Sequence, residues 1–78
     1  MDGVEIIVPA AAAEVDEIAA LLAAEVPYAS AGTEIRGDEV VFWAHLAERE
    51  QALLATRDVV AGLAAQGAGV DPGRVRAQ

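Results

Sequence analysis

The amino-acid sequence predicts a mainly α-helical fold, and three observations lead to that prediction. Nineteen of the 78 residues are alanine, which has the highest helix propensity. The stretch from Asp38 to Gln66 contains no proline, a single interior glycine, and apolar residues at helical spacing. Only residues 4–8 have the short, β-branched composition of a strand. We therefore expect a short N-terminal strand and two helices, in a dimer or a larger assembly.

The expected elements form a single small helical domain over residues 1–66, with a C-terminal tail at 67–78. In chain order they are a strand at Val4–Val8, a helix at about 10–25 ended by Pro27, a loop to Gly37, and a long helix at about 38–66 capped by Asp38. A single strand does not persist alone in water. We expect it to pair with Thr33–Arg36 or, as the alternative, with the same strand of a second copy.

The long helix carries more apolar surface than the helix at 10–25 can cover. On a helical wheel, one stripe contains Phe42, Leu46, Leu53 and Val60, and a second contains Trp43, Ala47, Leu54 and Ala61. The uncovered stripe predicts an interface with a second copy or with another protein. The expected partner-binding residues are Phe42, Trp43, Leu46, Glu50, Leu53, Leu54, Arg57 and Val60.

Glu50 and Arg57 lie two helical turns apart, near the boundary between the two stripes. They could pair with Arg57 and Glu50 of an antiparallel copy and so set the register of a homodimer. Alternatively they border the interface and extend into water. The sequence leaves both interpretations open.

The size of the chain also favours association. Beyond alanine it has only 24 larger apolar residues and no cysteine, so neither a large core nor a disulfide can stabilise it. The sequence has neither the basic N-terminal region of a signal peptide nor a long apolar segment, which predicts a cytoplasmic protein without a membrane span. We expect a homodimer or higher oligomer, or a complex with a protein partner.

Charge argues against nucleic acid as a partner. The chain has a net charge of −8, and eleven acidic residues fall within residues 1–50 against two basic ones. Such a body repels phosphate backbones. In one interpretation the negative charge serves solubility, and in the other the acidic surface meets a basic partner or mimics nucleic acid.

The sequence contains no recognisable catalytic or cofactor motif. Ser30 is the only serine, there is no lysine, and no glycine pattern matches a phosphate-binding loop. His45, the only histidine, has Glu48 three residues on, a spacing that could form half of a metal site or could be ordinary surface charge. We predict no enzyme, no cofactor and no metal.

One known family has a similar order of elements. The residues concerned are Val4 to Pro9, then Val15, Ile18 and Leu22, then Ile35 to Val41. Over about residues 4–46, this pattern resembles the ribbon-helix-helix family. The resemblance implies a dimer with paired N-terminal strands that reads DNA. The family's basic DNA-reading positions are missing, since the outward strand positions would be Glu5 and Ile7.

Taken together, the sequence predicts a non-enzymatic interaction or assembly protein, a small acidic helical subunit of a homo-oligomer or of a larger particle such as a viral one. The alternative, implied by the resemblance, is a ribbon-helix-helix-type transcriptional regulator or antitoxin.

Overall fold

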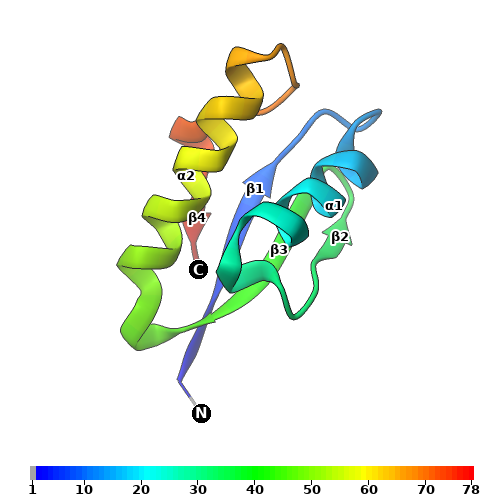
Figure 1. Ribbon diagram of the computed structural model, residues 1–78. Helices are drawn as coiled ribbons and strands as arrows, with labels where there is room; N and C mark the ends of the chain where they lie inside the picture. Colours follow the sequence, from blue (N-terminus) through cyan, green and yellow to red (C-terminus); the bar gives the residue numbers. More distant parts are fainter. Residues whose placement is uncertain (1) are drawn as a thin grey trace.

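The computed structural model describes residues 2–78 and alternates strands and helices in the order strand, helix, strand, strand, helix, strand (Figure 1). The strands are β1 (Gly3–Pro9), β2 (Glu34–Arg36), β3 (Glu39–His45) and β4 (Arg76–Ala77), and the helices are α1 (Val15–Glu25) and α2 (Arg49–Ala65). Three single-turn 3-10 helices lie between them, η1 (Pro27–Ala29), η2 (Leu46–Glu48) and η3 (Pro72–Arg74).

The four strands form one antiparallel sheet in the order β2-β3-β1-β4. β1 and β3 pair along their whole length, from Gly3 opposite His45 to Pro9 opposite Glu39. α1 connects β1 to β2 across β3, and α2 connects β3 to β4 across β1. This is the split βαβ, or ferredoxin-like, topology.

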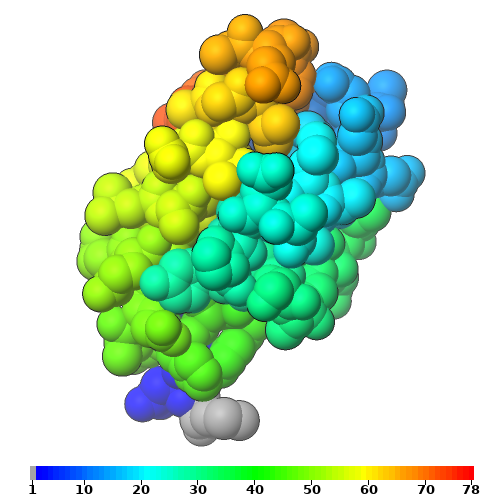
Figure 2. Space-filling view, viewed as in Figure 1, coloured from blue at the N-terminus to red at the C-terminus, as the bar shows by residue number. Residues whose placement is uncertain are grey.

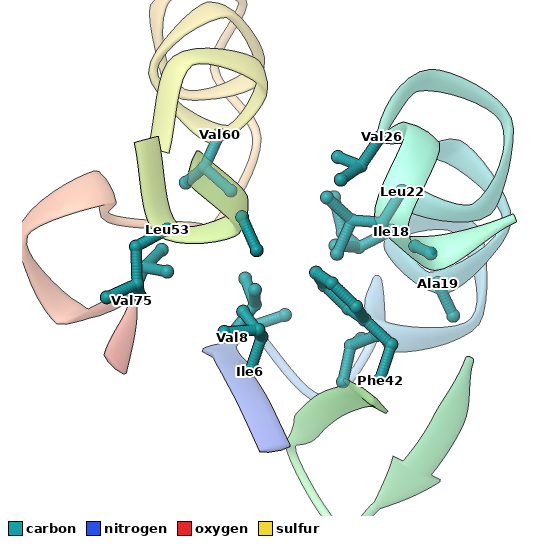
Figure 3. Packing of buried hydrophobic residues seen from close by; sticks show 14 of the residues in the cluster. Ile6, Val8, Ile18, Ala19, Leu22, Val26, Phe42, Leu53, Val60 and Val75 are labelled. Atoms are coloured by element: carbon teal, nitrogen blue, oxygen red, sulfur yellow. The ribbon is translucent and has the colours of Figure 1, made fainter. Parts of the chain in front are cut away.

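Both helices pack on the same face of the sheet, so the domain has two layers with the core between them (Figures 1 and 3). Side chains alternate along a strand, and every second residue of β1 and β3 faces the helices. The buried residues that meet there are Ile6, Val8, Val40, Phe42 and Ala44 from the sheet, Val15, Ile18, Ala19 and Leu22 from α1, and Ala52, Leu53 and Val60 from α2.

The prediction of a mainly α-helical fold is wrong, because the first part of the expected helix at 38–66 is strand β3. The helix begins only at Arg49. In residues 39–45, pairing with β1 along the whole strand and with β2 at Glu39–Val41 outweighs the helical spacing of the apolar residues. The expected strand at 4–8 lies within β1, and the helix expected at about 10–25 starts later, at Val15, and ends at Glu25.

The turn Gly37-Asp38 redirects the chain where the sequence suggested a helix start. It joins β2 to β3 in a hairpin whose register places Arg36 opposite Glu39. Gly37 has φ +64° while Asp38 has no positive φ, which is the pattern of a type II′ turn with glycine first. Asp38 is therefore a turn residue, and its carbonyl accepts a hydrogen bond from Ala10 N at 2.8 Å.

Residues 67–78, expected to be a tail, return to the sheet. Val75 is buried in the core, and Ile6 and Ile7 of β1 pair with Ala77 and Arg76 of β4. Main-chain hydrogen bonds of 3.0 and 2.9 Å join Glu5 and Gln78. The segment thus covers the second edge of β1.

Candidate interaction surface

The face of the sheet opposite the helices carries ion pairs that cross it. Arg36 of β2 donates to Glu5 of β1, with Nη1 3.0 Å from Oε1, and also pairs with Glu34. Arg76 of β4 pairs with Glu39 of β3 at 2.9 Å. In the strand order β2-β3-β1-β4, each arginine reaches across an intervening strand. The aliphatic parts of such side chains cover apolar surface, and Ile7 and Val41 on this face are only 3% exposed.

The ion pairs of Arg36 also shift the pKa values of Glu5 and of Arg36 itself. Hydrogen bonding by Arg36 holds the pKa of Glu5 below its ordinary value, and the two acceptors Glu5 and Glu34 raise the pKa of Arg36. The outward positions of the sheet centre are therefore occupied by charges that bind each other. Both shifts move the pKa away from neutral pH, whereas a catalytic acid–base pair needs pKa values shifted toward it.

Beyond the ion pairs, the end of β3 is apolar and exposed. Trp43 is 47% exposed and Leu46, in η2, is 50% exposed. The Trp43 ring lies edge-on to the His45 ring, with the two centroids 4.7 Å apart and an angle of 74° between the planes. Leu46 N donates to Asp2 O at 3.1 Å, which holds η2 beside the start of β1, and Figure 2 shows these two segments at the same end of the molecule.

The same end of β3 has an open main-chain edge. Hydrogen bonds from Ala10 N to Asp38 O and from Leu46 N to Asp2 O show which β3 residues bond to β1, namely those at even positions. The N–H and C=O groups of Trp43 and His45 therefore point away from β1. β2 pairs with β3 only from Glu39 to Val41, so within residues 2–78 no strand lies beside Trp43 and His45.

Hollows in the surface adjoin this edge on both faces. One is lined by Glu5, Glu34, Arg36, Val41 and Trp43 together with the loop 31–33. The second is lined by Tyr28, Ala31, Trp43, Ala44, His45 and Glu48, and a third by Asp2, His45, Leu46, Ala47 and Glu48. His45 and Glu48 line both of the latter two, so these residues form one continuous region. We call Trp43, His45, Leu46 and Glu48 the Trp43 surface.

The eight residues expected to bind a partner lie in three different environments. Trp43 and Leu46 belong to the Trp43 surface, where they line hollows that share His45 and Glu48, whereas Leu54, 65% exposed, lies on α2. Phe42, Leu53 and Val60 are in the core. Glu50 pairs with its neighbour Arg49, and Arg57 donates to Val75 O at 3.2 Å. Most of the apolar surplus of the expected long helix is thus buried within one chain.

The structure also places the residues considered for a metal. His45 and Glu48 line the same hollows, but among residues 2–78 no group of three or more His, Asp or Glu side chains could hold a metal ion. In the same part of the chain, no helix is long and apolar enough to span a membrane.

Sequence reasoning named Trp43 and Leu46 as partner-binding residues but did not foresee the open edge of β3. The edge depends on where β2 begins, at Glu34 opposite Val41, which local composition does not reveal. The one local signal was Gly32, which occupies a turn before β2 with φ +126°, its N–H donating to Ala29 O at 3.0 Å.

Comparison with protein-family models, with curated proteins and with solved structures finds no match for this chain. The ribbon-helix-helix resemblance therefore stays a prediction. In the structure, β1 pairs with β3 on one side and with β4 on the other.

Proposed function

We propose that this chain is a non-enzymatic protein-interaction module, a small acidic subunit of a homo-oligomer or of a larger assembly. Its docking site would be the Trp43 surface. The observation that carries the proposal is the half-exposed Trp43 and the half-exposed Leu46, which line hollows that share His45 and Glu48, in a chain whose other aromatic residues are buried or partly buried. Tryptophan contributes much of the binding energy at protein interfaces, and adjoining apolar residues on a surface mark binding sites.

The position of Trp43 supports this proposal. Its ring is held between Gly3 and His45 on a rigid strand, so little side-chain entropy is lost when a partner covers it. The nearby charges Glu5, Glu34 and Arg36 form a polar border on one side, as in interfaces with an apolar centre and a polar rim.

The experiment compares wild type with a Trp43→Ser/Leu46→Ser double variant and with Leu54→Ser as matched control. Leu54 is even more exposed than Leu46 but lies on α2, outside the Trp43 surface. Sedimentation velocity of the purified protein measures self-association, and quantitative affinity capture from the native host measures partner retention. Circular dichroism checks that each variant is folded.

We expect the double variant to lose the oligomer or the retained partner, and Leu54→Ser to keep it. A wild-type protein that is a monomer and retains no partner would contradict the proposal. Equal losses for the double variant and for Leu54→Ser would also contradict it, because the effect would then not depend on the Trp43 surface.

A further inference from the structure

Resting on the proposed function, we infer how the partner docks: an extended, basic segment of another protein adds as a strand to the open edge of β3 at Trp43–His45. It would occupy the place beside β3 that β2 leaves vacant after pairing with Glu39–Val41. Strand addition joins an extended peptide to an unpaired sheet edge by main-chain hydrogen bonds, with side-chain contacts giving specificity.

The main-chain geometry of the edge suits this mode of binding. Trp43 and His45 both direct N–H and C=O away from β1, so an added strand can exchange hydrogen bonds with two residues of β3. Ala44 between them bonds to Val4 of β1 and takes no part. The added strand would enter the hollows that Trp43 lines together with Tyr28 and the loop 31–33.

The two faces of the added strand would meet different surfaces. Successive side chains of a strand point to opposite faces of the sheet. On the open face they would contact Trp43 and His45, and on the helix-side face they would enter the hollow that Tyr28 and Ala31 line. Apolar side chains at alternate positions therefore share one face of the added strand, where they would meet either Trp43 and His45 or the hollow lined by Tyr28 and Ala31.

Charge selects a basic segment over a second copy of this chain. Within residues 2–78, ion pairs engage Arg36, Arg49 and Arg76, while no ion pair engages Asp2 or Glu48, which line the hollows at this end. A second copy would bring another net charge of −8 to the same edge. Lysine or arginine side chains of an extended partner would instead be attracted to Asp2 and Glu48.

His45 provides a substitution that tests the main chain alone. Its backbone angles, φ −66° and ψ 142°, are those that proline adopts, and its N–H faces the open edge. His45→Pro thus removes one donor of the docking edge without removing a hydrogen bond to β1. His45→Ala loses the same imidazole but keeps the N–H, so the difference between these two variants isolates the donor.

The probe is an acetylated and amidated peptide of alternating lysine and valine, eight residues long. Trp43 is the only tryptophan, so its fluorescence reports on the docking edge directly. We expect a saturable blue shift of its emission at low salt, weakening as salt rises. The same peptide with glutamate in place of lysine should bind at least about tenfold more weakly, as should His45→Pro compared with His45→Ala.

A second measurement does not depend on the variants folding. In the wild-type protein, amide hydrogen exchange at Trp43 and His45 should slow on addition of the lysine-valine peptide, because both N–H groups become hydrogen-bonded. Exchange at Ala44, already bonded to β1, should change much less.

Three results would overturn the inference. The first is unchanged amide exchange at Trp43 and His45 with saturating peptide. The second is equal binding of the lysine and glutamate peptides. The third is a wild-type dimer that His45→Pro dissociates, which would make a second copy the occupant. If the Trp43→Ser/Leu46→Ser variant still loses its partner in any of these cases, the proposed function stands and only the docking mode fails.

Discussion

The indole ring of Trp43 lies directly over Gly3, on the face of the sheet opposite the helices. A β-carbon built at Gly3 would come within 2.0 Å of Cε2 and Cζ2 of that ring. Gly3 is opposite His45 in the β1–β3 pairing, so the ring extends diagonally from β3 onto β1. Glycine in a strand often marks such a close approach, and here it determines where the exposed tryptophan rests.

Replacing this glycine should therefore move the ring. We expect Gly3→Ala to displace Trp43 into solvent, to red-shift its fluorescence, and to lower the free energy of unfolding by about 1 kcal/mol. The control is Gly62→Ala on α2, where an added β-carbon meets nothing within 4 Å. Alanine there should raise the free energy of unfolding by about 0.5–1 kcal/mol without changing the emission. An unchanged emission in Gly3→Ala would show that the ring does not rest on Gly3.

The neighbours Leu53 and Leu54 on α2 distinguish this two-layer domain from a long helix with two apolar stripes. Leu53 is 3% exposed and packs in the core, whereas Leu54 is 65% exposed. Leu53→Ala should lower the free energy of unfolding by about 2–4 kcal/mol, through lost burial and a cavity. Leu54→Ala should change it by less than about 0.5 kcal/mol. Urea unfolding followed by circular dichroism measures both, and similar losses for the two variants would contradict the fold.

Local pattern was sufficient to place β1, α1 and α2 approximately, but not β3. In β3 the inward residues Val40, Phe42 and Ala44 alternate as a strand requires. The alternation is hidden because the outward Val41 and Trp43 are apolar too. Val41 can be apolar there because the side chain of Arg36 extends across β3 to Glu5, a contact between residues 31 positions apart in the chain. Sequence patterning sees only the resulting apolar run and its helical spacing.

One local signal did favour a hairpin over a helix. Gly37-Asp38 separates two segments with β-branched residues, and glycine followed by aspartate is typical of a two-residue hairpin turn. Interpreting Asp38 as a helix cap led to the wrong element. The same misassignment is why Phe42 and Trp43 were both expected to bind a partner. Adjacent residues of a strand point to opposite faces, so of these two only Trp43 is exposed to a partner.

The end of the chain should contribute strongly to stability, since Val75 is 2% exposed and packs in the core. We expect Val75→Ala to lower the free energy of unfolding by about 1–3 kcal/mol, because it empties part of a closed core. The control is Val70→Ala at a half-buried position of the same segment, where about half that loss or less is expected. Thermal unfolding gives both values. A wild-type-like Val75→Ala would show that residues 67–78 are not part of the folded core.

The ion pair between Arg36 and Glu5 should make stability depend on acid pH in a specific direction. Because Arg36 lowers the pKa of Glu5 in the folded state, folding favours the ionised carboxylate. The stabilisation is then fully present above the pKa of an unfolded glutamate and is lost as pH falls through the lower, folded pKa. Arg36→Gln should remove it.

We therefore expect wild type to be more stable than Arg36→Gln at neutral pH, and the two to converge as pH falls through the lowered, folded pKa of Glu5. The carboxyl carbon shift of Glu5, followed by NMR titration, should give a pKa below 4.5 in wild type and a higher one in the variant. Arg74→Gln is the matched control, since Arg74 forms no ion pair within residues 2–78. The ion pair would carry none of the acid sensitivity if Arg36→Gln and wild type differed equally at neutral and at acid pH. In that case Arg36, which extends across β3, would shield Val41 from water only through the aliphatic part of its side chain.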